Sequence, residues 1–166
     1  MTTTTTARTA LSRDDVRPGV AHRVGLVAAA ALAVGVTAIH VLDQGGLLGL
    51  KDPAYLGWGY RGLEVAALVC ALLLLTGRHR LGWLLAIAVA AGPLLGITVS
   101  RSVGLPGATD DIGNWGETLG VAAMVVEASL LVLAVTALTT SSRALGRRTP
   151  AGRRAAVGAA VPSMSA

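Results

Sequence analysis

Five ionisable residues stand inside or at the ends of long apolar stretches of the chain. They are one imidazole, two guanidinium groups and two carboxyl groups: His40, Arg61, Glu64, Arg101 and Glu127. At membrane depth such groups are costly unless they are paired or hydrated, which makes them candidates to hold a proton, a metal ion or a small ligand. Buried ion pairs can instead serve only to fix how helices pack. We treat the five as a candidate polar cluster, with both roles open.

Their spacing limits which groups can pair. Arg61 and Glu64 are three positions apart, so they share a helix face and can pair locally. Glu127 has no ionic partner within one turn of its own helix, and it must be protonated or find a partner elsewhere. The available partners are Arg101, Arg61 and His40. Because small residues that permit close helix approach share its face, we expect Glu127 to face a bundle interior; they are Gly120, Ala123 and Ala134.

The connection 101–115 is a second candidate region, because it is rich in residues that favour specific turns. Two neighbouring aspartates in it could bind a cation weakly, but a bare pair lacks the number of ligands that calcium takes. We therefore expect solvated acids there. The candidate functional loop comprises Gly104, Pro106, Gly107, Asp110, Asp111 and Trp115.

Signatures of familiar enzymes are missing from the sequence. It has no G-x-S-x-G, no H-E-x-x-H and no Walker A motif. His40 is the one histidine at predicted membrane depth, so a haem held by two histidines has no second ligand, and Cys70 is typical of a packed side chain. We therefore assign no catalytic residue, no cofactor and no metal.

The elements that position these residues are apolar helices. Of 166 residues, 53% are hydrophobic and 14% are charged, against about 25% charged in an average soluble domain. This composition excludes an ordinary soluble enzyme and a disordered chain, and a single cysteine excludes a disulfide-rich module. A membrane-crossing helix needs about 20 mostly apolar residues. Four stretches qualify and predict an all-α fold, a four-helix transmembrane bundle with short loops: 22–42, 55–77, 81–100 and 117–139.

The third of these stretches contains Gly92 and Pro93, and Gly96 completes a G-x-x-x-G pattern. Pro93 removes one backbone hydrogen bond from the helix. Such a break can line a binding site in a transporter. A tolerated kink with close helix contact is the commoner use of the pattern, and it is our expectation here.

Charge patterning predicts orientation. Ten arginines lie in the two tails and the connection 78–80, and Arg23 stands at the same end of the first span, whereas Lys51 and Arg101 stand on the opposite side. Positively charged loops stay cytoplasmic, which places both termini in the cytoplasm and the bundle in the cell membrane. We expect a membrane domain over 21–141 and disordered tails over 1–20 and 142–166. The expected partner of the Arg-rich tail is the lipid bilayer, not nucleic acid. An alternative is that the first span is a cleaved signal peptide.

One segment carries a resemblance. Residues 100–107 read Ser-Arg-Ser-Val-Gly-Leu-Pro-Gly. This resembles an S-R-x-V-G-L-P-G element after the third of four spans in small actinobacterial membrane proteins of unassigned function. A tryptophan and a last-span glutamate follow in that family, where Trp115 and Glu127 look similar here, and His40 matches an upstream histidine. The resemblance covers about 39–138, implies four spans, and directs attention to Arg101 together with Glu127.

The sequence thus predicts a non-enzymatic membrane protein that acts through helix contacts with itself or with a larger partner. One alternative is a transporter, channel or sensor subunit with an outward-facing polar site at the candidate cluster. Another is a membrane enzyme or redox subunit. The arrangement of Glu64 and Glu127 discriminates between action through helix contacts and an outward-facing site. Carboxylates that are paired in a dry core indicate a packing role, whereas carboxylates that line an open cavity indicate a binding site.

Overall fold

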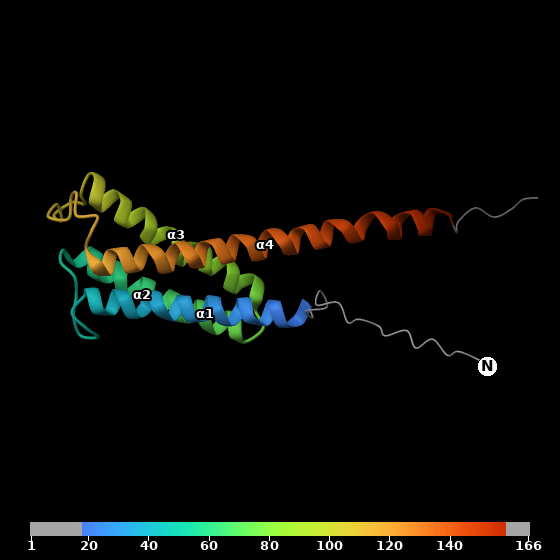
Figure 1. Cartoon of the computed structure of the whole chain (residues 1–166), viewed down its shortest axis with the longest axis horizontal. Coiled ribbons are helices and arrows are strands. Elements are labelled where there is room, and N and C mark those ends of the chain that lie inside the picture. Colours follow the sequence, from blue (N-terminus) through green and yellow to red (C-terminus); the bar gives the residue numbers. More distant parts are fainter. Residues whose placement is uncertain (1–17, 159–166) are drawn as a thin grey trace, which may run out of the picture.

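The computed structural model describes the backbone of residues 18–158 and the side chains of 19–142. It holds four helices in chain order: α1 (Pro18–Asp43), α2 (Ala54–Leu75), α3 (His79–Ser102) and α4 (Thr118–Gly158). Each helix packs against its neighbours in sequence, and α4 closes the ring against α1 (Figure 1). The predicted all-α four-helix bundle is confirmed.

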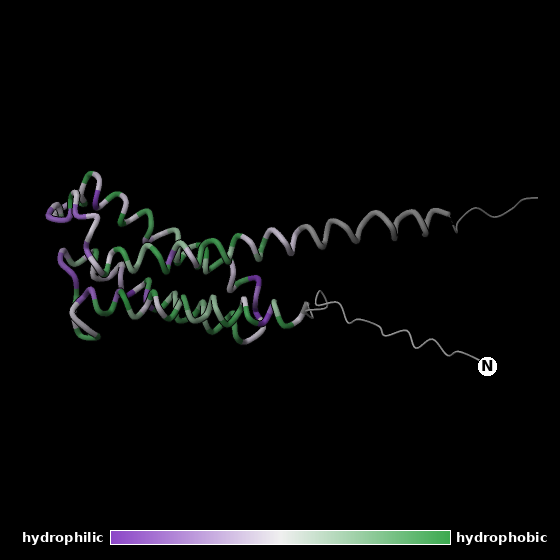
Figure 2. The backbone as a smooth tube through the Cα atoms, viewed as in Figure 1, coloured by the Kyte–Doolittle hydropathy of each residue, from purple (hydrophilic) through white to green (hydrophobic). Residues whose placement is uncertain are grey.

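Each helix contains a stretch long and apolar enough to cross a membrane. These stretches differ from the predicted spans by three residues at most; they are Gly19–Asp43, Ala54–Leu75, His79–Ser102 and Thr118–Ser142. Hydrophilic residues gather at the two ends of the bundle (Figure 2). One end, which we name the loop end, carries the connections 44–53 and 103–117, and the other, the turn end, carries the turn 76–78. This distribution indicates a membrane protein.

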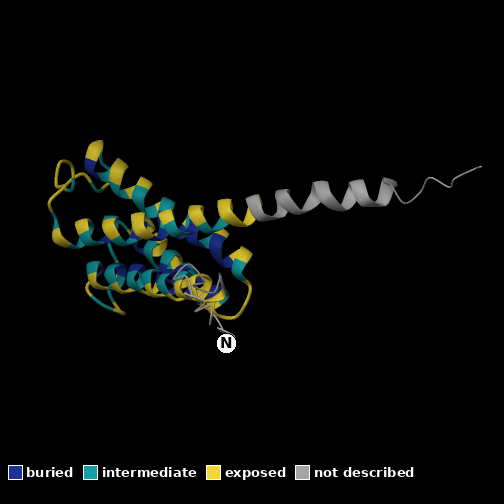
Figure 3. Cartoon of the chain, turned by 45° about the vertical axis from the view of Figure 1, so that its right-hand side comes forward, coloured by how far each residue is buried: buried dark blue, intermediate teal, exposed yellow. Residues whose placement is uncertain are grey.

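Buried residues lie on the faces that the helices turn toward one another (Figure 3), and many of them have small side chains. Ala29, Ala33, Ala67, Ala86 and Ala134 are almost fully buried. Larger apolar side chains are exposed on the outside: Val24, Val27, Val65, Leu72, Leu84, Leu95 and Val132. Small residues inside let backbones approach closely, and large apolar residues outside suit a lipid environment.

Near the turn end, α2 and α3 are in close contact at Gly82. A Cβ added there would lie 2.8 Å from Leu74 Cδ2 and 3.1 Å from the Leu74 backbone nitrogen. The Sγ of buried Cys70 also donates to the Gly82 carbonyl at 3.4 Å. The absent side chain of Gly82 therefore sets how closely these two helices pack.

At the loop end, α3 leans away from α1 and α2 (Figure 1). The expectation of close helix contact through Gly92 and Gly96 is wrong, because an added Cβ at either glycine meets no atom within 4 Å. Pro93 lies inside the helix between them. A proline inside a helix removes one backbone hydrogen bond, and Gly92, Pro93 and Gly96 line a space at the loop end that the other helices do not fill.

The C-terminal tail is helical over much of its length. The sequence predicts a disordered tail over 142–166, but α4 continues as a helix to Gly158 (Figure 1). Residues 143–158 contain five arginines and four alanines, which favour a helix, together with three glycines and one proline, which do not. Extending an existing helix needs no new nucleus, which favours the continuation. Residues 1–17 and 159–166 lie outside the described part of the chain.

Candidate functional site

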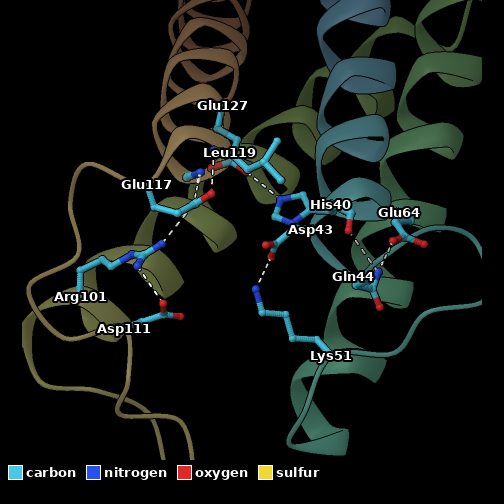
Figure 4. A network of polar contacts seen from close by, with 11 residues as sticks. His40, Asp43, Gln44, Lys51, Glu64, Arg101, Asp111, Glu117, Leu119 and Glu127 are labelled. Carbon is cyan, nitrogen blue, oxygen red and sulfur yellow. Dashed lines mark hydrogen bonds and ion pairs between the residues drawn. The ribbon is translucent and has the colours of Figure 1, made fainter.

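His40 on α1 and Glu127 on α4 form a buried pair at the loop-end half of the bundle (Figure 4). The imidazole Nε2 and the carboxyl Oε1 are 3.0 Å apart, and the exposed fractions of the two residues are 6% and 1%. The Tyr60 ring on α2 packs edge-on against the imidazole, with ring centroids 4.8 Å apart. Glu127 therefore faces the interior, as its helix face predicted, and its partner is the imidazole.

The other ring nitrogen of His40 is unsatisfied. Nδ1 is buried and has no hydrogen-bond partner among the described residues. If Nε2 donates to Glu127, a neutral imidazole leaves a lone pair on Nδ1, whereas an imidazolium leaves a buried N–H. Leaving a buried donor without an acceptor costs more than an ordinary hydrogen bond contributes. The protein alone therefore does not complete the hydrogen bonding of this residue.

Arg101, at the end of α3, joins the second connection to the start of α4. Its Nη1 donates to Asp111 Oδ1 at 2.9 Å and its Nη2 to Glu117 Oε2 at 3.3 Å (Figure 4). Glu117 also accepts from the backbone amides of Leu119 at 2.8 Å and Gly120 at 2.5 Å. A carboxylate at a helix N-terminus satisfies amides that lack partners and is favoured by the helix dipole. Arg101 is thus held by two acids and does not pair with Glu127.

Arg61 and Glu64 belong to a separate network. Arg61 Nη1 donates to Glu64 Oε2 at 2.8 Å, which is the local pair that their spacing predicts. Arg61 Nη2 donates to carbonyls of the first connection, namely Gly46, Leu47 and Gly49. The amide of buried Gln44 donates to the other oxygen of Glu64. This network fixes the connection 44–53 against α2, so its geometry is that of a packing device.

A cavity of about 340 Å³ lies at the loop end and is lined by all four helices. His40, Arg101 and Glu127 are on its wall, and Arg61, Glu64 and Gln44 are not. Further polar wall residues come from both connections and from α1, α2 and α3: Asp43, Lys51, Tyr60, Ser100, Asp111 and Glu117. Lys51 and Asp43 are paired at 2.5 Å, and the Lys51 ammonium also lies 5.6 Å from the Tyr60 ring centroid. The candidate cluster is therefore divided: three of its five residues share the cavity.

The candidate loop is held by main-chain contacts. Gly104 and Gly107 have φ of +80° and +73°, which side chains disfavour. The Pro106 carbonyl accepts from the Tyr55 hydroxyl at 2.8 Å. Asp111 lines the cavity, whereas Asp110 and Trp115 are exposed. The two aspartates therefore differ: Asp111 is paired with Arg101, and Asp110 projects outward.

Several polar residues of this region are not predicted from the sequence. Asp43 and Gln44 follow His40 by three and four positions, a spacing that places them on one helix face, and this signal could have found them. Glu117 directly precedes an apolar helix, where an acid is a capping signal. Lys51 carries no such signal, because its place beside Asp43 depends on how the connection folds.

The fold and the site together define a four-helix membrane bundle with a polar cavity at one end. Within the described residues, no group of three His, Cys, Asp or Glu side chains could hold a metal ion. Comparison with protein-family models, with curated proteins and with solved structures finds no match. The resemblance to four-span actinobacterial proteins therefore stays a prediction.

Proposed function

We propose that this protein binds a small molecule inside the membrane, as a transporter or a sensor subunit does, and that the loop-end cavity is its site. One observation supports this above all: the buried His40–Glu127 pair is part of the wall of a cavity of about 340 Å³. Ligand sites are concave, mostly apolar, and equipped with a few fixed polar groups. An ionisable group at membrane depth is a candidate functional group by default.

The other function predicted from the sequence, action through helix contacts with a partner, has weaker support. The large apolar side chains on the outside of the bundle suit lipid as well as a protein surface. They therefore do not favour a partner. Among the polar residues, the Arg61–Glu64–Gln44 network supports a packing role for that part of the cluster, since it lies off the cavity.

We further propose that the loop end faces the outside of the cell and that both termini are cytoplasmic. The support is the concentration of arginines at the turn end and in the tails, since positive residues remain inside. A C-terminal fusion to green fluorescent protein should fluoresce, and a C-terminal alkaline phosphatase fusion should be inactive. The reverse pair of results would overturn this orientation.

The binding function can be tested by filling the cavity. Gly96 lines it and has no atom within 4 Å of an added Cβ, so a side chain can begin there without a clash, and Gly96→Leu should occupy part of the space. Gly62 on α2 has equal room but does not line the cavity, which makes Gly62→Leu the matched control. In a thermal-shift screen of small molecules, compounds that stabilise the parent and Gly62→Leu should leave Gly96→Leu unchanged. Equal responses in both variants would contradict the proposal.

A further inference from the structure

The cavity wall carries more carboxylates than lysine and arginine side chains. Asp43 is paired with Lys51, and Arg101 is shared by Asp111 and Glu117. Glu117 is further stabilised by two amides at the start of α4. These carboxylates therefore have cations or helix-terminal amides as partners.

Glu127 is the exception among the described cavity carboxylates. Its partner is the His40 imidazole, which carries a positive charge only when it is protonated. With His40 neutral, Glu127 is a carboxylate 1% exposed, with no full positive charge beside it. A buried carboxylate is destabilised by desolvation unless a cation or a proton compensates it. The Nδ1 of His40, on a residue 6% exposed, also has no hydrogen-bond partner among the described residues.

The remainder of the wall is apolar. Ile39 and Leu63 contribute to it from α1 and α2, and Ile97 and Ala123 from α3 and α4. Gly59 on α2, with Gly92 and Gly96 on α3, lines the cavity and is also exposed, so the cavity opens between these two helices. A ligand that fits this wall has an apolar body as well as a charge.

We propose that the cavity takes a monovalent organic cation, an alkylammonium group joined to an apolar body, with its charge against Glu127. The proposal rests on the proposed function, and it specifies the ligand class of that site. The ammonium places a full positive charge beside the Glu127 carboxylate, whose only ion-pair partner among the described residues is the His40 imidazole. The apolar body lies against the aliphatic wall and the Tyr60 ring, whose face also attracts cations.

The first test compares two probes of one shape. Phenyltrimethylammonium is a permanent cation, and tert-butylbenzene is its neutral isostere with carbon in place of nitrogen. With the full chain in a non-ionic detergent, calorimetry should show binding of the cation, and the neutral isostere should bind at least about tenfold more weakly. This comparison needs no variant, so it does not depend on a variant folding.

Two variants test whether Glu127 is the carboxylate that holds the cation. Glu127→Gln keeps the shape and removes the charge, and it should weaken cation binding by about tenfold or more. Asp52→Asn removes an exposed carboxylate outside the cavity and should leave binding unchanged. Equal affinities in these two variants, or equal affinities for the cation and its isostere, would overturn the proposal.

A further experiment identifies the source of the ammonium group. The ammonium could belong to a free amine or to a lipid headgroup, so binding is repeated in phosphatidylglycerol nanodiscs with and without phosphatidylethanolamine. If phosphatidylethanolamine competes with the cation, the site binds a lipid headgroup; if it does not compete, the site binds a free cation. Either result supports an ammonium ligand.

If the cation does not bind but neutral or anionic compounds bind and are lost in Gly96→Leu, the ligand class is wrong and the binding function stands. If Gly96→Leu alters no ligand, both fail.

Discussion

His40 Nε2 and Glu127 Oε1 are 3.0 Å apart although the residues are 87 positions apart in the chain. The pair joins the end of α1 to the middle of the membrane-crossing part of α4, and these helices are neighbours in the ring. Glu127 shares its helix face with buried Ala123, Leu130 and Ala134, so the face that packs α4 also carries the carboxyl group. Packing and site are therefore properties of the same helix surface.

A double-mutant comparison measures what the pair contributes to stability. His40→Leu alone leaves the carboxyl of Glu127 buried without a partner, and Glu127→Leu alone leaves the imidazole in that position. Each should lower the free energy of unfolding by about 1–3 kcal/mol. The double variant His40→Leu/Glu127→Leu should recover most of the loss, because two apolar side chains leave no unsatisfied group. Unfolding by sodium dodecyl sulfate in mixed micelles gives these energies, and additive losses would contradict a direct interaction.

Arg61 should not be replaceable by lysine. Its guanidinium group contacts the Glu64 carboxylate and the carbonyls of the first connection at the same time. Lysine has one ammonium group and cannot reproduce this fork, so Arg61→Lys should cost about 1–3 kcal/mol and raise the rate of proteolysis within 44–53. Arg78→Lys at the turn end, where the arginine is exposed, is the control. Equal proteolysis of both variants would contradict the anchoring role.

Gly104 should resist any side chain. Its φ is +80°, and an added Cβ would lie 3.0 Å from Ile112 Cδ1. Gly104→Ala should lower stability by about 1–2 kcal/mol, because an L-residue is strained in this conformation. Gly116→Ala has open space and no positive φ, so it should be close to neutral. Thermal melts of the two variants in detergent make the comparison, and a neutral Gly104→Ala would show that the loop conformation is not required for stability.

Gly82 should be equally sensitive at the opposite end. An added Cβ meets the Leu74 side chain and backbone, so Gly82→Ala should push α2 and α3 apart and lower stability by about 1–3 kcal/mol. Gly25→Ala on α1 has no neighbour within 4 Å and should instead be neutral or slightly stabilising, since alanine favours helix. The midpoint of thermal unfolding distinguishes them. Equal midpoints would mean that these helices adjust without cost.

Much of this arrangement can be predicted from local sequence. The apolar stretches predict the four helices, because a membrane-crossing helix has a required length and composition. The spacing of Arg61 and Glu64 predicts their pairing, because three positions bring side chains to the same helix face. Small residues on one face of α4 predict that Glu127 is buried.

The sequence by itself determined the fold class and which helix face is turned inward, since both depend on the period and composition of single helices. Only the tertiary structure decided that Glu127 meets His40, that Arg101 is held by Asp111 and Glu117, and that Gly92 and Gly96 line a cavity. Local spacing fixes a residue's direction about its own helix axis but not the tilt of neighbouring helices or the path of the connections. The lean of α3 and the folded connections supply that information, because partners between helices depend on crossing geometry and not on sequence distance.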